Sequence, residues 1–157
     1  MKTKQDSPGV YIPPPLIYVL IFIAAIFIQK RVHIDDALFR LRLTRGICIL
    51  FLIAAFFFLS TSLAKFFKTR NTVILVKPAS SLQTDGVYAI SRNPMYVGLL
   101  FIYLGITCFI GNWWNIILVP LLIFIMQAYV IKSEEKYLER AFGDEFIEYK
   151  KRVRRWL

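Results

Sequence analysis

The sequence predicts an all-α integral membrane protein, and three observations support this fold class. The chain of 157 residues is 57% hydrophobic and 16% aromatic, which is too apolar for a soluble domain of this size. Three stretches, 10–28, 46–64 and 95–131, contain no charged side chain. Each is long enough to cross a bilayer, because a hydrocarbon core of about 30 Å needs roughly 20 helical residues.

Four membrane spans are expected. The first is opened by the prolines at 13–15, and the second begins at Gly46. The third apolar stretch is long enough for two short helices, with Gly111 and Asn112 as the turn between them. We therefore predict helical spans over 12–29, 46–66, 94–110 and 113–131.

The distribution of cations predicts the orientation. If the spans alternate, the N-terminus, the second loop and the C-terminal tail share one side and carry most of the 20 Lys and Arg residues. The positive-inside rule then places both termini in the cytoplasm, and we expect the location to be a bacterial inner membrane. The first apolar run lacks a small-residue cleavage pattern, so we expect it to stay as a span. The first loop is also basic, and we expect residues 34–43 to lie along the interface.

Composition also argues against several kinds of site. A net charge of +10 suggests contact with anionic lipid headgroups in a membrane protein, and we expect no nucleic-acid partner. We expect no metal site, because His33 is the single histidine and no Cys or His cluster is present. Cys48 and Cys108 lie in apolar spans, where thiols behave as small hydrophobes, so neither is predicted to form a disulfide.

The loop over 68–93 is the first place where chemistry is expected. It contains a β-branched run at 72–76 and ends at Arg92-Asn93-Pro94, where proline can begin the next helix at no cost in hydrogen bonds. One interpretation is purely structural: Arg92 reaches lipid phosphates and Asn93 caps the helix. The other is that these residues form half of a small-molecule site at the membrane surface.

The tail over 132–157 is the other half of that predicted site. Glu134 and Glu135 stand at the end of the fourth span, where contact with anionic lipid alone would favour cations. The helix is expected to break at Gly143 and to resume from Glu145 to Trp156 as an amphipathic segment. Such a pattern is typical of a helix lying in the interface. Its apolar stripe comprises Leu138, Phe142, Phe146, Tyr149, Val153 and Trp156.

Four ordered motifs resemble the isoprenylcysteine carboxyl methyltransferase family and, more distantly, the phospholipid N-methyltransferases. They are Lys77-Pro78-Ala79-Ser80, Asp85-Gly86-Val87-Tyr88, SRNPMYVG from Ser91, and EEKYLERAFGDEFIEYKKRVRRWL from Glu134. The resemblance covers about half of the chain, and the proline-rich N-terminus is similar to the short bacterial members. It implies that S-adenosylmethionine is the cofactor, held in a pocket open to the cytoplasm beside a tunnel for a lipophilic acceptor.

The resemblance also implies roles for individual residues. Arg92 and Arg152 match the family arginines at the acceptor carboxylate, and a guanidinium suits a carboxylate because it can bind both oxygens. Carboxylates would accept the ammonium or hydroxyl groups of the cofactor, and tyrosines would flank its adenine. Asn93 replaces the histidine of many members, so it can orient a ligand but not transfer a proton. The predicted cofactor-binding residues are Tyr88, Asn93, Pro94, Tyr96, Gly98, Glu134 and Glu135.

Several functions remain open at this point. The acceptor is a carboxylate such as that of a prenylcysteine-like molecule, a phospholipid amine, or a thiol. Membrane sterol reductases share a similar Arg-His-Pro element, so an NADPH-dependent reductase is an alternative enzyme. A small four-helix carrier is the non-enzymatic alternative, although proton-coupled carriers need an ionisable residue at mid-membrane and these spans contain no acidic one.

Overall fold

The computed structural model describes residues 8–68 and 81–157, and its regular elements in those ranges are all helical, as predicted. The β-branched run at 72–76 and the Lys77-Pro78 motif lie outside the described residues. The long helices are α1 (Pro14–Arg31), α2 (Arg42–Lys68) and α3 (Pro94–Ile110). The remaining elements are shorter: η1 (Ala37–Arg40), η2 (Gly86–Ala89), α4 (Trp113–Ile117), α5 (Val119–Ile125), the π-helical η3 (Met126–Ile131), α6 (Lys132–Phe142) and α7 (Asp144–Arg152).

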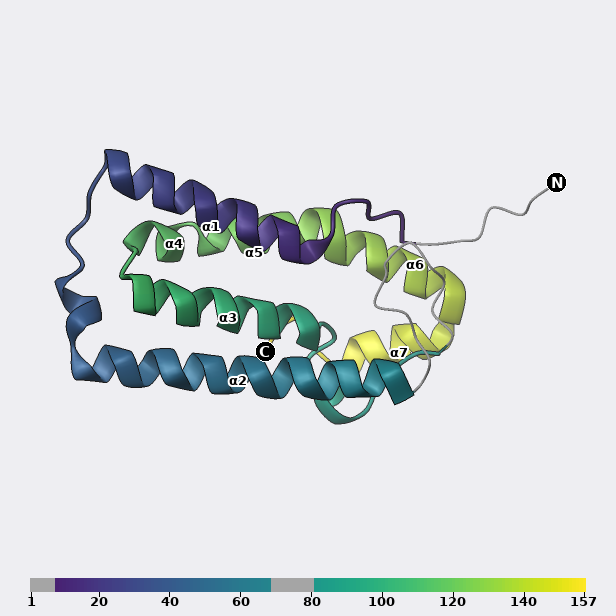
Figure 1. Ribbon diagram of the computed structural model, residues 1–157. Coiled ribbons are helices and arrows are strands. Elements are labelled where there is room, and N and C mark those ends of the chain that lie inside the picture. The colour runs from purple at the N-terminus through teal and green to yellow at the C-terminus, as the bar shows by residue number, and fades with distance from the viewer. Residues whose placement is uncertain (1–7, 69–80) are drawn as a thin grey trace.

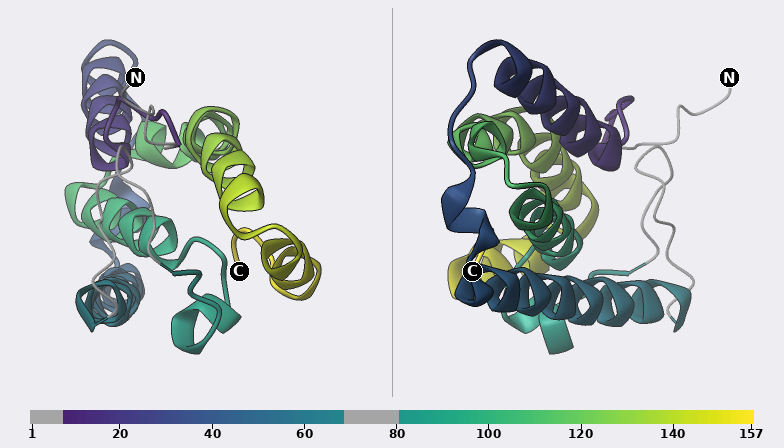
Figure 2. Two further views of the ribbon diagram at one scale, coloured as in Figure 1. Left: turned by 90° about the vertical axis from the view of Figure 1, so that its right-hand side faces the viewer. Right: turned by 60° about the vertical axis from the view of Figure 1, so that its left-hand side comes forward.

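The helix α3 lies between α1 and α2, and the chain from α4 to η3 returns alongside α1 (Figures 1 and 2). At the end where α3 begins, the chain turns between α6 and α7 (Figure 1), and α7 contacts η2 through Tyr149. Two helices are long and apolar enough to cross a membrane, α1 and the part of α2 from Arg42 to Lys65. The helix α3 is apolar but has 17 residues. The four spans as a set remain a prediction.

The prediction of one continuous α-helix over 113–131 is wrong. The helix breaks at Leu118, between α4 and α5, because Pro120 has no backbone N–H and its ring would clash with the preceding turn. Proline instead stands in the first turn of α5, where the missing donor costs nothing. The last six residues, Met126–Ile131, form a π-helical stretch that runs directly into α6.

Other helix ends differ from the prediction by a few residues. The helix α1 begins two residues later than expected, at Pro14, and α2 begins four residues earlier than expected, at Arg42. The observed helix α3 has the predicted bounds. It ends at Gly111, whose φ of 72° favours glycine, and the Asn112 side chain then accepts a hydrogen bond from the Trp114 N–H at 2.9 Å to cap α4.

The tail is helical only in part, which corrects the prediction of helices throughout 132–157. The helix α7 ends at Arg152, and Val153 has extended backbone angles. Residues 153–157 turn back toward the beginning of α3 (Figure 2). The helix ends there because the carbonyl groups of Arg154 and Arg155 accept hydrogen bonds from the Arg92 loop instead of from a further helical turn.

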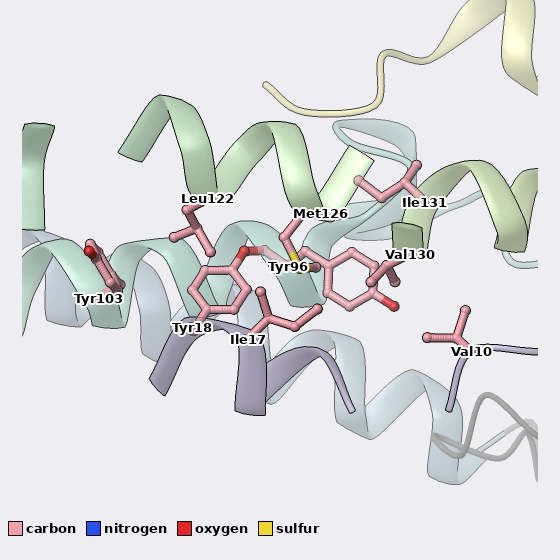
Figure 3. Close-up of a cluster of buried hydrophobic side chains, with 9 residues drawn as sticks. All are labelled: Val10, Ile17, Tyr18, Tyr96, Tyr103, Leu122, Met126, Val130 and Ile131. Carbon is pink, nitrogen blue, oxygen red and sulfur yellow. The ribbon is translucent and has the colours of Figure 1, made fainter. Parts of the chain in front are cut away.

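A buried cluster between α1, α3 and the α5–η3 segment supports the first turns of α3 (Figure 3). The Tyr18 hydroxyl donates a 2.9 Å hydrogen bond to the carbonyl oxygen of Tyr96, so α1 is tied to α3 where the predicted site begins. The buried members are Val10, Ile17, Tyr18, Tyr96, Tyr103, Leu122, Met126, Val130 and Ile131.

Two glycines allow α2 and α3 to approach closely. A Cβ atom at Gly98 would lie 2.7 Å from Cγ of Leu59, and one at Gly105 would lie 2.6 Å from Cδ2 of Leu52. The glycines are seven residues apart and so are the leucines, which places both contacts on one face of each helix. Glycine at these positions therefore serves packing rather than a special backbone angle.

Replacing Gly105 with alanine should destabilise the helix pair. Overpacking costs about 1–3 kcal/mol, whereas alanine returns about 1 kcal/mol of helix propensity. The expected result is a lower unfolding temperature in detergent. Gly46→Ala in α2 is the matched control, because nothing lies within 4 Å of its added Cβ. It should leave the unfolding temperature unchanged or raise it, and equal behaviour of the two variants would contradict the packing role.

Candidate functional site

Three charged side chains from distant parts of the chain form one buried cluster. Arg155 Nε donates to Oε1 of Glu135 at 2.8 Å, and its Nη2 donates to Oε2 at 2.7 Å. Arg92 Nη1 lies 3.0 Å from the same Oε1. The side chains of Arg92 and Glu135 are each only 10% exposed. One carboxylate therefore holds two guanidinium groups in fixed positions.

The hairpin topology explains why these residues meet. Arg92 precedes α3, which runs away from the cluster, and the segment from α4 to η3 runs back to deliver Glu135 in the first turn of α6. The sequence predicted this meeting from the turn at Gly111 and Asn112. The 3.0 Å contact between Arg92 and Glu135 confirms it.

The C-terminal segment closes the cluster from the other side. The backbone N–H of Arg92 donates to the carbonyl oxygen of Arg154 at 2.8 Å. Ser91 Oγ and Asn93 Nδ2 both donate to the carbonyl oxygen of Arg155, at 3.0 and 2.9 Å. Asn93 stands at the N-cap position of α3, but its side chain holds this segment instead of capping the helix. The capping role that the purely structural interpretation gave to Asn93 is therefore wrong.

Glu134 lies beside the cluster in a different environment. The Tyr96 hydroxyl donates a 2.7 Å hydrogen bond to its Oε1. Burial raises the pKa of Glu134 to about 7; the Tyr96 hydrogen bond opposes this shift and the charge of Glu135 adds to it. Burial also acts on Glu135, but the hydrogen bond from Arg155 and the charge of Arg92 hold the pKa of Glu135 below its ordinary value. Two adjacent carboxylates thus have opposite shifts, which is typical of functional sites.

Aromatic side chains surround the charged groups. The Tyr149 hydroxyl of α7 donates a 2.6 Å hydrogen bond to the carbonyl oxygen of Tyr88 in η2, and both tyrosines are buried. Burial raises the pKa of each, so both hydroxyls stay protonated near neutral pH. Trp156 packs against the cluster that contains Tyr88 and against the one that contains Tyr96. The charged groups therefore lie in an apolar, aromatic environment.

Arg92 has hydrogen-bonding capacity to spare. Its Nε is buried and has no hydrogen-bond partner among the residues that the structure describes, whereas its Nη1 is at ion-pair distance from Glu135. Burial lowers the pKa of Arg92, and the charge of Glu135 opposes this effect. A buried guanidinium with unused donors is costly unless an oxygen acceptor binds to it. Such a site suits a ligand with a carboxylate or another anionic oxygen.

The structure separates the predicted site residues into two groups. Arg92, Asn93, Tyr96, Glu134 and Glu135 belong to one network of contacts. Tyr88 borders it through Tyr149, whereas Pro94 and Gly98 are buried within α3, and Gly98 faces Leu59 of α2. Arg152 is exposed at the last turn of α7 and does not join the cluster; Arg155 occupies that place.

Sequence reasoning missed four residues of this site: Ser91, Tyr149, Arg155 and Trp156. All four stood within quoted motifs, and Tyr149 and Trp156 were predicted only as members of the apolar stripe. Arg155 was missed because a helix was expected to continue through it, and an extended backbone reverses which side chains face inward. No signal in the sequence marks the end of α7 at Arg152.

Comparison with known proteins matches the region that contains this site. A family model described as phospholipid methyltransferase matches residues 41–145. The protein-S-isoprenylcysteine O-methyltransferase of Schizosaccharomyces pombe is 39% identical over 72 residues, which cover 46% of this chain and 30% of that protein. Protein-S-isoprenylcysteine O-methyltransferase B of Arabidopsis thaliana is 36% identical over 72 residues, covering 46% of this chain and 36% of that protein.

A third relative is much shorter. An uncharacterized protein of Haemophilus influenzae is 44% identical over 66 residues, which cover 40% of this chain and 100% of that protein. The matches to the yeast and plant enzymes span about a third of their length. No solved structure matches the chain significantly. The matches confirm the resemblance inferred from the motifs, and because the family model covers well over half of the sequence, including Arg92, Tyr96, Glu134 and Glu135, the chain belongs to the phospholipid methyltransferase family.

Proposed function

We propose that this chain is an S-adenosylmethionine-dependent methyltransferase of the membrane that acts on a lipophilic acceptor. The observation that carries the proposal is the contact between Arg92 and Glu135, beside the hydrogen-bonded pair of Glu134 and Tyr96. These residues come from the two motifs on which the family resemblance depends. The yeast and plant relatives, which are named O-methyltransferases, support the reaction type.

The proposed setting is a bilayer crossed four times, with the site at the cytoplasmic face. In support, many large apolar side chains of the helices point outward, where lipid would cover them. The joined segment from α4 to η3 and the helix α3 would supply the two shorter spans. Outward-facing examples are Leu20, Phe27, Leu50, Phe56 and Phe124, all more than half exposed.

The residues of the site fit S-adenosylmethionine. The cofactor supplies a methyl group activated by a positively charged sulfur. Glu134, held by Tyr96 through Oε1, would accept its ammonium or ribose hydroxyl groups. Glu135 is already bound to two arginines, so we propose that it positions Arg92 rather than binding the cofactor directly. Aromatic groups such as Tyr88 would exclude water around the reacting atoms.

The proposed acceptor is a carboxylate, as in a prenylcysteine-like molecule. The unpaired Nε of Arg92 could donate a hydrogen bond to one of its oxygens. Arg155, rather than the exposed Arg152, is the second arginine near that place. A phospholipid amine is the second candidate, because the matching family model is described as phospholipid methyltransferase. In that case the arginines would bind the lipid phosphate.

The cofactor can be tested by calorimetric titration of detergent-purified protein with S-adenosylhomocysteine and, in parallel, with NADPH. Binding of S-adenosylhomocysteine alone is the expected result. Binding of NADPH alone would favour the reductase, and binding of neither would contradict both enzymes. Transfer of a labelled methyl group to a prenylcysteine or to phosphatidylethanolamine then identifies the acceptor class.

Binding of S-adenosylhomocysteine should depend on pH through Glu134. The pKa of about 7 means that the carboxylate is mostly protonated below this pH, and a protonated acid attracts the ligand's ammonium group weakly. Titration of a single group changes the affinity by at most about tenfold per pH unit. Affinity for S-adenosylhomocysteine should therefore fall about tenfold from about pH 8 to about pH 6. Calorimetry of the wild type and of Glu134→Gln checks this.

Glu134→Gln should bind more weakly at about pH 8 and lose the pH dependence, because its amide does not titrate. Glu145→Gln is the control, since Glu145 is exposed on α7. It should retain the wild-type profile. An unchanged pH dependence in Glu134→Gln would remove Glu134 from the cofactor site.

A further inference from the structure

We propose that Cys48 and Cys108 are a redox-active thiol pair, which an external disulfide converts into a bond between α2 and α3. The pair lies at the end of the bundle away from Arg92 and Glu135. It takes no part in the proposed methyl transfer and forms a separate modification site.

The two cysteines lie in one buried cluster where α2 and α3 pack together. Cys48 is in the second turn of α2 and Cys108 in the last turn of α3; they are 1% and 8% exposed. Their side chains share a buried cluster with Phe39. A Cβ atom at Gly105, one turn before Cys108, would lie 3.4 Å from the Cys48 carbonyl oxygen. A disulfide needs Cα atoms within about 4.4–6.8 Å, and the close approach at Gly105 brings the backbone of Cys48 near α3 one turn before Cys108.

A cavity gives both thiols a route to solvent. It has a volume of about 320 Å³, and its lining includes both cysteines and the charged residues Asp36, Arg40 and Arg45. Buried cysteines without access are inert, whereas cations lining the route to a thiol attract anionic reagents. Arg40 is paired with Asp36 at 2.8 Å. Arg45 adds a second positive charge to the cavity lining.

The reaction balances as thiol–disulfide exchange. The thiolate of one cysteine attacks an external disulfide, forms a mixed disulfide and releases one thiolate. The second cysteine thiolate then attacks the mixed bond and releases the other. The two cysteines lose two electrons to the external disulfide, and the two protons pass to the released thiols. The oxidant is a protein or small-molecule disulfide of an oxidising compartment.

The compartment follows from the orientation in the proposed function. If the Arg92 and Glu135 cluster faces the cytoplasm, the cysteine pair lies at the opposite surface, where disulfides persist. The thiol chemistry itself needs neither the cofactor nor this orientation. The two parts can therefore be tested separately.

The first test uses purified full-length protein in detergent. After reduction and denaturation, a maleimide polymer should add to two thiols per chain. After exposure of the folded protein to oxidised glutathione it should add to none, and the mass should fall by two hydrogens without attached glutathione. Cys48→Ser should instead keep one glutathione or one free thiol. Two free thiols in the treated wild type would overturn the proposal.

A charge control tests the cavity. Arg45→Glu should slow oxidation by anionic oxidised glutathione several-fold relative to cationic cystamine, and an unchanged ratio would exclude Arg45 from the route. The compartment is tested by acid-trapping thiols in intact bacterial cells. We expect the wild type to be oxidised there. If the thiols are free in cells but the purified protein is still oxidised, the proposed orientation is wrong. The proposal of a redox-active thiol pair would not be affected by that result.

Discussion

Replacing Glu135 with alanine should destabilise the protein more than any other single change at the site. It would leave Arg92 and Arg155 close together without their shared carboxylate, and the Arg92 side chain is only 10% exposed. Removing one partner of a buried ion pair costs about 3–5 kcal/mol. At about 2–4 °C per kcal/mol for a chain of this size, the unfolding temperature should fall by roughly 10 °C.

Thermal unfolding in detergent measures this effect, with Glu145→Ala as the matched control. Glu145 is exposed in the first turn of α7, and its loss should change the unfolding temperature little. The unfolding temperature of Glu135→Gln should lie between those of Glu135→Ala and Glu145→Ala, because an amide keeps the shape and one acceptor oxygen but loses the charge. A Glu135→Ala protein as stable as the wild type would mean that the three charges do not hold the segments together.

Replacing Arg92 with lysine should reduce turnover by at least about tenfold. Lysine keeps the positive charge but loses the planar fork, and with it the Nε donor that the guanidinium holds in the site. A charge-assisted hydrogen bond is worth about 1.5–3 kcal/mol, which corresponds to roughly tenfold or more in rate. Affinity for S-adenosylhomocysteine should change little if Arg92 binds the acceptor.

The control is Arg152→Lys, which should keep wild-type turnover because Arg152 is exposed on α7. Turnover is measured on a prenylcysteine and on phosphatidylethanolamine. If Arg92→Lys is fully active on either acceptor, Arg92 does not hold a carboxylate there. A loss in Arg152→Lys equal to that in Arg92→Lys would restore the original pairing of the two arginines at the acceptor and would argue against Arg155.

Much of the fold could be predicted because the apolar runs and the helix stops have simple physical causes. A glycine with a positive φ ends α3, as the sequence indicated for Gly111. The break at Leu118 was also readable, since Pro120 stands seven residues into the expected helix. It was missed because an apolar run of spanning length was taken as one continuous helix.

The site was predictable in part, for a different reason. Arg92 and Glu135 are placed by the hairpin, and the hairpin follows from one turn and two runs of similar length. Arg155 and Asn93 depend on tertiary hydrogen bonds between segments about sixty residues apart. Such bonds leave no periodicity in the sequence. A local sequence pattern therefore assigns Arg152 and Arg155 to the charged cluster equally well. Only the path of the chain after Val153 distinguishes them.

The π-helical stretch η3 has a consequence for how the carboxylates are aimed. A π-turn holds about one more residue than an α-turn, and each residue of an α-helix advances the side chains by roughly 100°. If the same six residues, Met126–Ile131, formed an α-helix instead, α6 would turn by about 100°. Glu134 would then leave Tyr96 and Glu135 would leave Arg92, although the composition of the site would be unchanged. The angular phase of one helix, set by a single surplus residue, is thus as necessary to this site as the charged groups themselves.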